Sequence, residues 1–142
     1  MLKVIAGVVI GCLGWVMLAA PADAASIRNV YFSNGSVQQG QTYRTPGELP
    51  GPAKGFESGK DPVARMFIIL GDMDAHKFRG DLKAADGKVV RKMNVDVPSL
   101  NRSATWRFWT HAFGLKDLAP GTYSIDLIVD DMPAGTHSFT LK

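Results

Sequence analysis

Cysteine is nearly absent from this sequence: among its 142 residues, Cys12 is the one cysteine. A single cysteine forms no disulfide within the chain and makes no Cys-x-x-Cys redox or zinc motif. Other short motifs that carry chemistry are missing too. The sequence has no Gly-x-Ser-x-Gly nucleophile elbow, no phosphate-binding glycine loop and no His-Glu-x-x-His pair. No local motif therefore indicates an enzyme, and none indicates a cofactor.

The chain also lacks a strong excess of charge of one sign. Sixteen Lys and Arg residues stand against 13 Asp and Glu residues, which gives a net charge of +3, and the two signs are interspersed along the sequence. Attraction to nucleic acid or to an anionic membrane surface usually needs a concentrated basic patch. We therefore expect no nucleic-acid partner.

The first 24 residues have the order of a signal peptide. A short basic start, Met1–Lys3, precedes an apolar run over Val4–Ala20, and Ala22-Asp23-Ala24 satisfies the small-x-small rule for cleavage before Ala25. The apolar run contains three glycines and is short for a retained membrane span. We expect residues 1–24 to be removed, leaving a periplasmic or secreted protein without a stable membrane span.

An alternative at the N-terminus is lipid attachment. Val9-Ile10-Gly11-Cys12 loosely matches the cleavage sequence of lipoproteins, but cleavage there leaves Leu13–Ala20 as an apolar tail. Cleavage before Ala25 removes Cys12 with the signal peptide, so the mature chain has no cysteine. Its stability must then come from an apolar core rather than from disulfides.

Residues 25–142 follow the patterns of an all-β domain. Apolar and polar residues alternate with a period of two, or run continuously over a buried stretch, in seven segments bounded by turn residues. These segments are Ile27–Phe32, Val63–Leu70, His76–Ala84, Val89–Val97, Ala104–Phe113, Thr122–Val129 and Thr136–Leu141. We predict one domain with the fold of an immunoglobulin-like antiparallel β-sandwich of about seven strands.

The last two strands form the clearest pattern in the chain. They are joined by turn residues at Asp130–Gly135, and Pro120-Gly121 precedes Tyr123 at the start of the first of them. Immunoglobulin-like sandwiches place a corner tyrosine at this position, with its hydroxyl bonded to the backbone a few residues upstream. We predict that role for Tyr123.

The terminal hairpin carries a resemblance. Its Pro-Gly-Thr-Tyr strand, acidic turn and final Ser-Phe-Thr-Leu strand resemble the last hairpin of bacterial envelope immunoglobulin-like sandwich modules. Small periplasmic copper-binding sandwiches are similar here, with a Gly-Thr-Tyr strand, an Asp-containing turn and a Phe-Thr strand. That family relies on a histidine near its mature N-terminus, whereas this chain is expected to begin Ala25-Ser26. The resemblance implies the fold and carries over no copper ligand.

The strand over Ala104–Phe113 has large aromatic residues on both faces. If Trp106 and Phe108 face the core, the alternate residues form an outward row of aromatic and cationic groups, typical of a binding surface. Between the first two strands, residues 40–62 hold five glycines and four prolines, a long loop that is either functional or disordered. We predict ligand-binding residues in the row and in this loop: Arg107, Trp109, His111, Phe113, Tyr43 and Phe56.

Three functions remain open on these grounds. The first is a non-enzymatic binding or assembly module whose partner is an envelope protein or a glycan. The second is a copper-type metal-binding protein, with Asp72, Asp74 and His76 as candidate ligands, although the two aspartates also suit an ordinary turn. The third is a small secreted enzyme. For the aromatic strand, the alternative to a binding surface is that the long loop folds over its outer face and buries a second small core.

Overall fold

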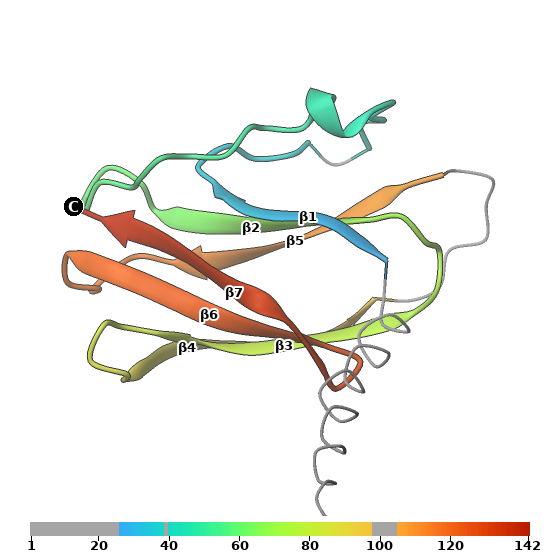
Figure 1. Cartoon of the computed structure of the whole chain (residues 1–142). Coiled ribbons are helices and arrows are strands. Elements are labelled where there is room, and N and C mark those ends of the chain that lie inside the picture. The colour runs from blue at the N-terminus through green and yellow to red at the C-terminus, as the bar shows by residue number, and fades with distance from the viewer. Residues whose placement is uncertain (1–25, 39, 98–104) are drawn as a thin grey trace, which may run out of the picture.

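The computed structural model describes residues 26–38, 40–97 and 105–142, which form two antiparallel sheets packed face to face (Figure 1). The strands are β1 (Ile27–Ser33), β2 (Val63–Leu70), β3 (His76–Lys83), β4 (Val89–Val97), β5 (Arg107–Gly114), β6 (Gly121–Val129) and β7 (Met132–Leu141). One sheet has the order β1-β2-β5 and the other β4-β3-β6-β7. The prediction of an all-β sandwich of seven strands is confirmed.

The strand order is that of an immunoglobulin-like sandwich. β2 pairs with β5 in the three-stranded sheet, while β3 pairs with β6 in the four-stranded sheet. These two pairs interlock, because the chain crosses between the sheets after β2, after β4 and after β5. β4 adds a fourth strand beside β3, so the two sheets differ in width.

The main core lies between the sheets, and β2 is buried on its other face as well. Met66, Ile68 and Leu70 of β2 point into the main core, whereas Phe67 and Ile69 belong to a second cluster on the outside of the same sheet. The continuous apolar run of β2 follows from this position, since a central strand covered on both faces needs no polar face.

A long connection between β1 and β2 covers the outer side of the three-stranded sheet (Figure 1). It contains one 3₁₀ turn, Pro46–Glu48, and then passes along the edges of both sheets. Ala53 N–H donates to Phe32 O (2.9 Å), and Phe56 N–H donates to Thr140 O (2.9 Å). The region predicted as a long loop is therefore held by backbone hydrogen bonds at its second half.

Two details of the strand ends differ from the sequence prediction. The β6–β7 turn is shorter than Asp130–Gly135, because Asp130 (φ 52°) and Asp131 (φ 66°) both adopt left-handed backbone and close a two-residue turn. β7 then begins at Met132. In β4, a register shift opposite Leu82–Lys83 turns Val90 toward the core and leaves Val89 37% exposed, so the period-two alternation predicted for this segment is broken at its start.

Some predictions fall on residues that the structure does not describe. These are the signal peptide over 1–24 and the start of the aromatic strand at Ala104. Among residues 26–38, 40–97 and 105–142 there is no helix with the length and apolar character needed to cross a membrane.

Tyr123 has the predicted corner role. Its side chain is 4% exposed, its ring lies 5.6 Å from that of Phe139, and its hydroxyl donates a hydrogen bond to Ala119 O. This bond ties the start of β6 to the turn that precedes it.

Removing the Tyr123 hydroxyl tests the contribution of this bond. We expect Tyr123→Phe to lower the free energy of unfolding by about 1 kcal/mol, because the Ala119 carbonyl loses a buried donor while the ring keeps its packing. Chemical denaturation of both proteins measures the difference. An unchanged midpoint with an unchanged slope would show that the corner bond adds no stability.

Candidate functional site

The predicted outward row on β5 faces the interior of the sandwich. Arg107 is 7% exposed and Phe113 is 1% exposed. The Trp109 ring packs against the main core and lies 5.5 Å from the Phe78 ring at an interplanar angle of 11°. His111 is half-buried between Trp109 and Phe113, with ring centroids at 5.8 Å and 4.6 Å. The prediction that this row points outward is wrong.

The inversion has a simple physical cause. Strand side chains alternate with a period of two, so an error of one residue exchanges the two faces. β5 carries aromatic rings at both even- and odd-numbered positions. Its sequence pattern therefore does not indicate which of its two faces is buried in the core. The aromatic residues that do point outward are Phe108 on β5 and Trp106 just before it, the two that were expected to face the core.

These outward residues belong to an outer aromatic cluster, defined as Tyr31, Tyr43, Phe67, Trp106 and Phe108. Tyr31 stacks on Phe67 with centroids 5.2 Å apart. Phe108 is at the centre, 6.2 Å from Phe67, 6.1 Å from Trp106 and 5.6 Å from Tyr43. Phe67 is fully buried, whereas the other four rings are half-buried, so the cluster keeps partly accessible aromatic surface.

The β1–β2 connection forms part of this cluster. Tyr31 Oη donates to Pro50 O (2.8 Å), and Trp106 Nε1 donates to Arg44 O (3.0 Å). Leu49 packs beneath, against Phe67 and Ile69. The sequence also allowed the long loop to bury a second small core on the outer face of the aromatic strand. The buried residues Leu49, Phe67 and Ile69 form such a core at the bottom of the outer aromatic cluster.

The two predicted binding residues in the connection have different positions. Tyr43 is half-buried in the outer aromatic cluster. Phe56 is fully buried in the main core, with its ring 5.2 Å from that of Phe139, so its predicted place on a ligand-binding surface is wrong. It closes the gap between the sheets at their β1 and β7 edges. An isolated phenylalanine among glycines and prolines gave no sign of this in the sequence.

A charged cluster lies at one end of the sandwich, where the β2–β3 connection meets the β6–β7 turn. The His76 side chain is buried there and lies between two carboxylates. Its Nδ1 is 2.6 Å from Asp130 Oδ2 and its Nε2 is 2.7 Å from Asp72 Oδ1. Both ring nitrogens therefore have an acceptor beside them, as suits the doubly protonated imidazolium.

Both carboxylates and Arg107 extend this cluster to neighbouring segments. Asp72 accepts from Ser26 N–H (2.8 Å), and Asp130 accepts from Lys77 N–H (2.9 Å). Arg107 Nε donates to Asp72 O (3.1 Å), and its guanidinium also donates to Asp74 O. We call Asp72, His76, Arg107 and Asp130 the charged clasp, because together they join the starts of β1, β3 and β5 to the β6–β7 turn.

Hydrogen bonding decides the ionisation of the clasp. Burial alone lowers the pKa of an imidazole, but the bonds with Asp72 and Asp130 raise the pKa of His76 above its ordinary value. Burial alone raises the pKa of a carboxyl group, but the bond from His76 and the backbone N–H donors lower the pKa of both Asp72 and Asp130. The clasp is thus an ion cluster with the imidazolium at its centre.

Of the predicted metal ligands, the structure brings Asp72 and His76 together and uses Asp74 through its backbone. Asp130 is the partner that the sequence analysis missed, because it lies 54 residues from His76 and no local spacing links them. In the part of the chain that the structure describes, no group of three or more His, Cys, Asp and Glu side chains is arranged to hold a metal ion.

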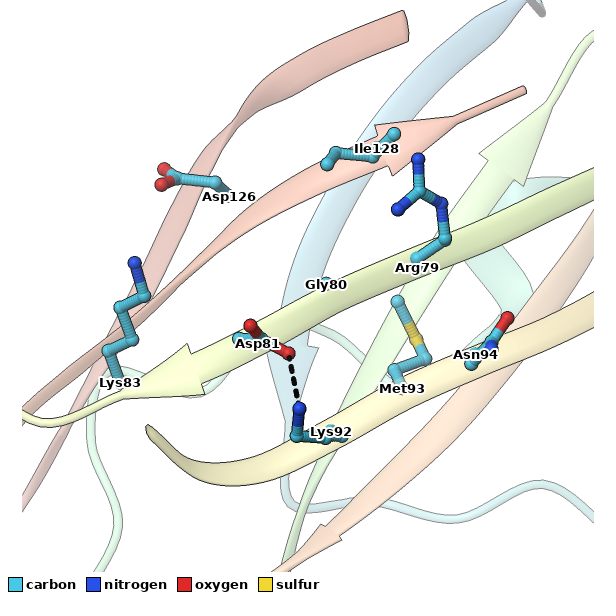
Figure 2. A pocket seen from close by; sticks show the side chains of 9 residues that line it. All are labelled: Arg79, Gly80, Asp81, Lys83, Lys92, Met93, Asn94, Asp126 and Ile128. Carbon is cyan, nitrogen blue, oxygen red and sulfur yellow. Dashed lines mark ion pairs between the residues drawn. The ribbon is translucent and has the colours of Figure 1, made fainter. Parts of the chain in front are cut away.

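A further concave feature is an open groove of about 420 Å³ on the outer face of the four-stranded sheet (Figure 2). Its charged side chains have mixed signs: Arg79, Asp81, Lys83, Lys92 and Asp126. Lys92 Nζ lies 3.9 Å from Asp81 Oδ1, as drawn in Figure 2, and Arg79 bonds to Asp131 at its rim (2.8 Å). The groove is therefore a solvated polar surface whose charges partly neutralise one another.

Comparison with known proteins gives little similarity. No protein-family model matches this chain, and no curated protein matches it. Among solved structures, the chain is similar to AlkC, an alkylpurine DNA glycosylase of Pseudomonas fluorescens bound to DNA containing an abasic site analog. The similarity covers 90% of this chain and 33% of that chain, at 11% sequence identity and a TM-score of 0.44. At this level the likeness carries no argument about fold or function.

The inward position of Trp109 leads to a stability prediction. We expect Trp109→Ala to lower the free energy of unfolding by about 3 kcal/mol, because it removes a ring stacked on Phe78 and leaves a void at the core. Thermal or denaturant unfolding measures the loss. Val89→Ala is the matched control, since Val89 is an exposed apolar residue, and it should change stability little. Equal effects of the two changes would contradict the inward assignment.

The charged clasp leads to a pH prediction. The folded pKa of His76 lies above its unfolded value of about 6.5, so its stabilising effect is complete below that pH and is lost as the pH rises through the folded pKa. We therefore expect the denaturation midpoint to decrease as the pH rises through the folded pKa of His76. Burial lowers the pKa of His111, so this residue acts in the opposite direction. Its neutral form is favoured in the folded state, and the domain loses stability as the pH falls below about 6.5.

His76→Gln is the variant that isolates this effect. Below about pH 6.5, the ordinary pKa of histidine, this variant should be less stable than the parent. Its denaturation midpoint should not decrease as the pH becomes alkaline. Denaturation at a series of pH values gives both curves. If the two proteins show parallel curves, His76 is not the group responsible.

Proposed function

We propose that this chain is an exported, non-enzymatic binding or assembly module of the bacterial envelope. In this proposal an envelope protein or a glycan docks on the outer aromatic cluster. The observation that carries it is the set of half-buried rings Tyr43, Trp106 and Phe108, which are contiguous on the outer face of the three-stranded sheet.

The arrangement of these rings supports binding. Flat aromatic side chains give a large contact area with few rotamers to immobilise, and they dominate the binding energy of many interfaces. Here the rings are also fixed before a partner arrives, because Trp106 Nε1 is bonded to Arg44 O and the Tyr43 ring meets Phe108 edge to face. A partner would therefore find an ordered apolar surface.

Charged groups border the same surface. Arg44 is exposed on the connection, where its N–H is bonded to Glu48 (2.9 Å), and Arg28 reaches Thr105 O at 3.5 Å. Cationic side chains beside aromatic rings suit a partner that has acidic or hydroxyl groups around an apolar face. Both an envelope protein and an acidic glycan meet this description.

The export part of the proposal is supported by the sequence. The order of basic start, apolar run and Ala22-Asp23-Ala24 is that of a signal peptide, and the mature chain contains no cysteine that an oxidising compartment would alter. The fold suits a cysteine-free exported domain, because its stability rests on an apolar core between two sheets.

Site-specific crosslinking in the native envelope tests the docking surface. We expect a photo-crosslinking residue at position 43 to give a discrete adduct in intact cells, because the half-buried Tyr43 ring is part of the cluster and lies on the connection that covers it. Once the adduct is identified, Tyr43→Ala should weaken its binding by about 2 kcal/mol, as for removal of an aromatic anchor.

Two controls make the result specific. A crosslinker at Val89, exposed on the other sheet, should give no such adduct. Crosslinking captures a glycan partner poorly. Binding of a glycan is therefore tested by calorimetry with purified envelope glycan fragments. Identical adducts from both positions, or none from position 43 together with no glycan binding, would contradict the proposed surface.

A further inference from the structure

β5 forms an edge of the three-stranded sheet and pairs there only with β2; no strand among the described residues pairs with its other side. The pairing with β2 is regular, since all eight residues from Arg107 to Gly114 are in register without a bulge. β5 also contains no proline and no lysine. Within the described residues, β5 therefore carries no proline, lysine or bulge to keep its edge from pairing with another chain, although Arg107 is an inward-facing charge and Arg91 caps the edge at Gly114.

The other three edges are each protected. β1 has a register irregularity near Ile27 and is met along its outer side by Ala53 N–H, which donates to Phe32 O. β7 contains Pro133 and is paired at its end with Phe56. β4 carries Arg91 and Lys92 beside a register shift. The contrast makes β5 the edge suited to accept a further strand.

The hydrogen-bond register shows which backbone groups of β5 face outward. Leu115 N–H donates to Pro62 O (3.0 Å), which continues the β2–β5 register by one pair beyond Val63 and Gly114. Hydrogen-bonded pairs alternate along an antiparallel ladder, so the odd-numbered residues of β5 bond to β2. The N–H and C=O groups of Phe108, Thr110 and Ala112 point away from β2. In agreement, Gly114 O is reached from the outside by Arg91 Nε at 3.1 Å.

We propose that two copies of this chain pair through β5, antiparallel, about a two-fold axis at Thr110, so that their three-stranded sheets become one continuous sheet. In this register Thr110 lies opposite its own copy, and Phe108 lies opposite Ala112 of the second copy. All three are outward-facing residues, so each pair exchanges two backbone hydrogen bonds. A two-fold interface requires self-complementarity, and this register provides it.

The side chains fit this register on both faces of the joined sheet. On the outer face the large Phe108 ring meets the small, exposed Ala112, and two threonines meet at the axis, a favourable cross-strand pair. On the inner face Trp109 lies opposite His111 of the second copy, which continues the ring stacking that these residues already make within one chain. Thr110, the residue on the axis, is uncharged and therefore does not repel its own copy.

Charge substitutions on the axis test this pairing sharply. The mature parent chain should show a concentration-dependent monomer–dimer equilibrium in analytical ultracentrifugation. Thr110→Lys should weaken association at least about tenfold, because two lysines then face each other at the axis. Thr110→Glu should do the same. An equimolar mixture of the two variants should restore the dimer as a Lys–Glu heterodimer, because only a residue on the axis meets its own position.

A matched control and a backbone variant complete the test. Thr122→Lys places the same charge on an exposed strand residue of the other sheet and should leave association unchanged. Thr110→Pro removes an N–H that points away from β2 and pairs with no strand among the described residues, so it should abolish the dimer while leaving the unfolding midpoint near that of the parent. A parent chain that stays monomeric at every concentration, or a mixture of variants that stays monomeric, would overturn the proposal. Tyr43→Ala should leave association unchanged, because Tyr43 takes no part in the β5 pairing, although Phe108 belongs to both the dimer interface and the proposed docking surface.

Discussion

Burial of β2 on both faces is the constraint on which the other features of this domain depend. In the strand sequence Val-Ala-Arg-Met-Phe-Ile-Ile-Leu, Arg65 is the single polar residue, so both sides of the strand need to be covered. The four-stranded sheet covers one side, and the β1–β2 connection covers the other. The aromatic rings of β1 and β5 flank this covered side. The outer aromatic cluster is thus a consequence of how the central strand is buried, and its incomplete coverage leaves the aromatic surface on which we propose that a partner docks.

Much of the fold could be predicted from the sequence, because alternation with a period of two locates strands and turn residues separate them. Tyr123 could be assigned from the Pro-Gly turn just before it. The orientation of β5 could not be predicted. Aromatic residues occupy both its even- and odd-numbered positions, so neither face is more apolar than the other. The length of the β6–β7 turn was also missed, since two consecutive aspartates in left-handed backbone are uncommon and only the glycine and proline nearby suggested a turn.

The candidate site was predicted less completely, and the reason is sequence separation. Asp72, Asp74, His76 and Arg107 were each singled out, but as two unrelated groups, a metal site and a binding row. The structure joins them because β2, β3 and β5 end or begin at the same edge of the sandwich, and it adds Asp130 from the β6–β7 turn. An ion cluster of this kind is costly to desolvate, so it stabilises the fold only while every member keeps its partner. It therefore favours one arrangement of these segments over nearby alternatives.

The pairing of the β1–β2 connection with the end of β7 has a consequence for how the domain forms and opens. Phe56 and Leu141 form a parallel bridge between segments far apart in the chain, and such contacts close late in folding because the loop entropy must be lost first. Release of the connection from the sheets would expose Phe67 on one side of β2 and the pocket of Phe56 on the other. Amide exchange in this segment would report such opening separately from global unfolding.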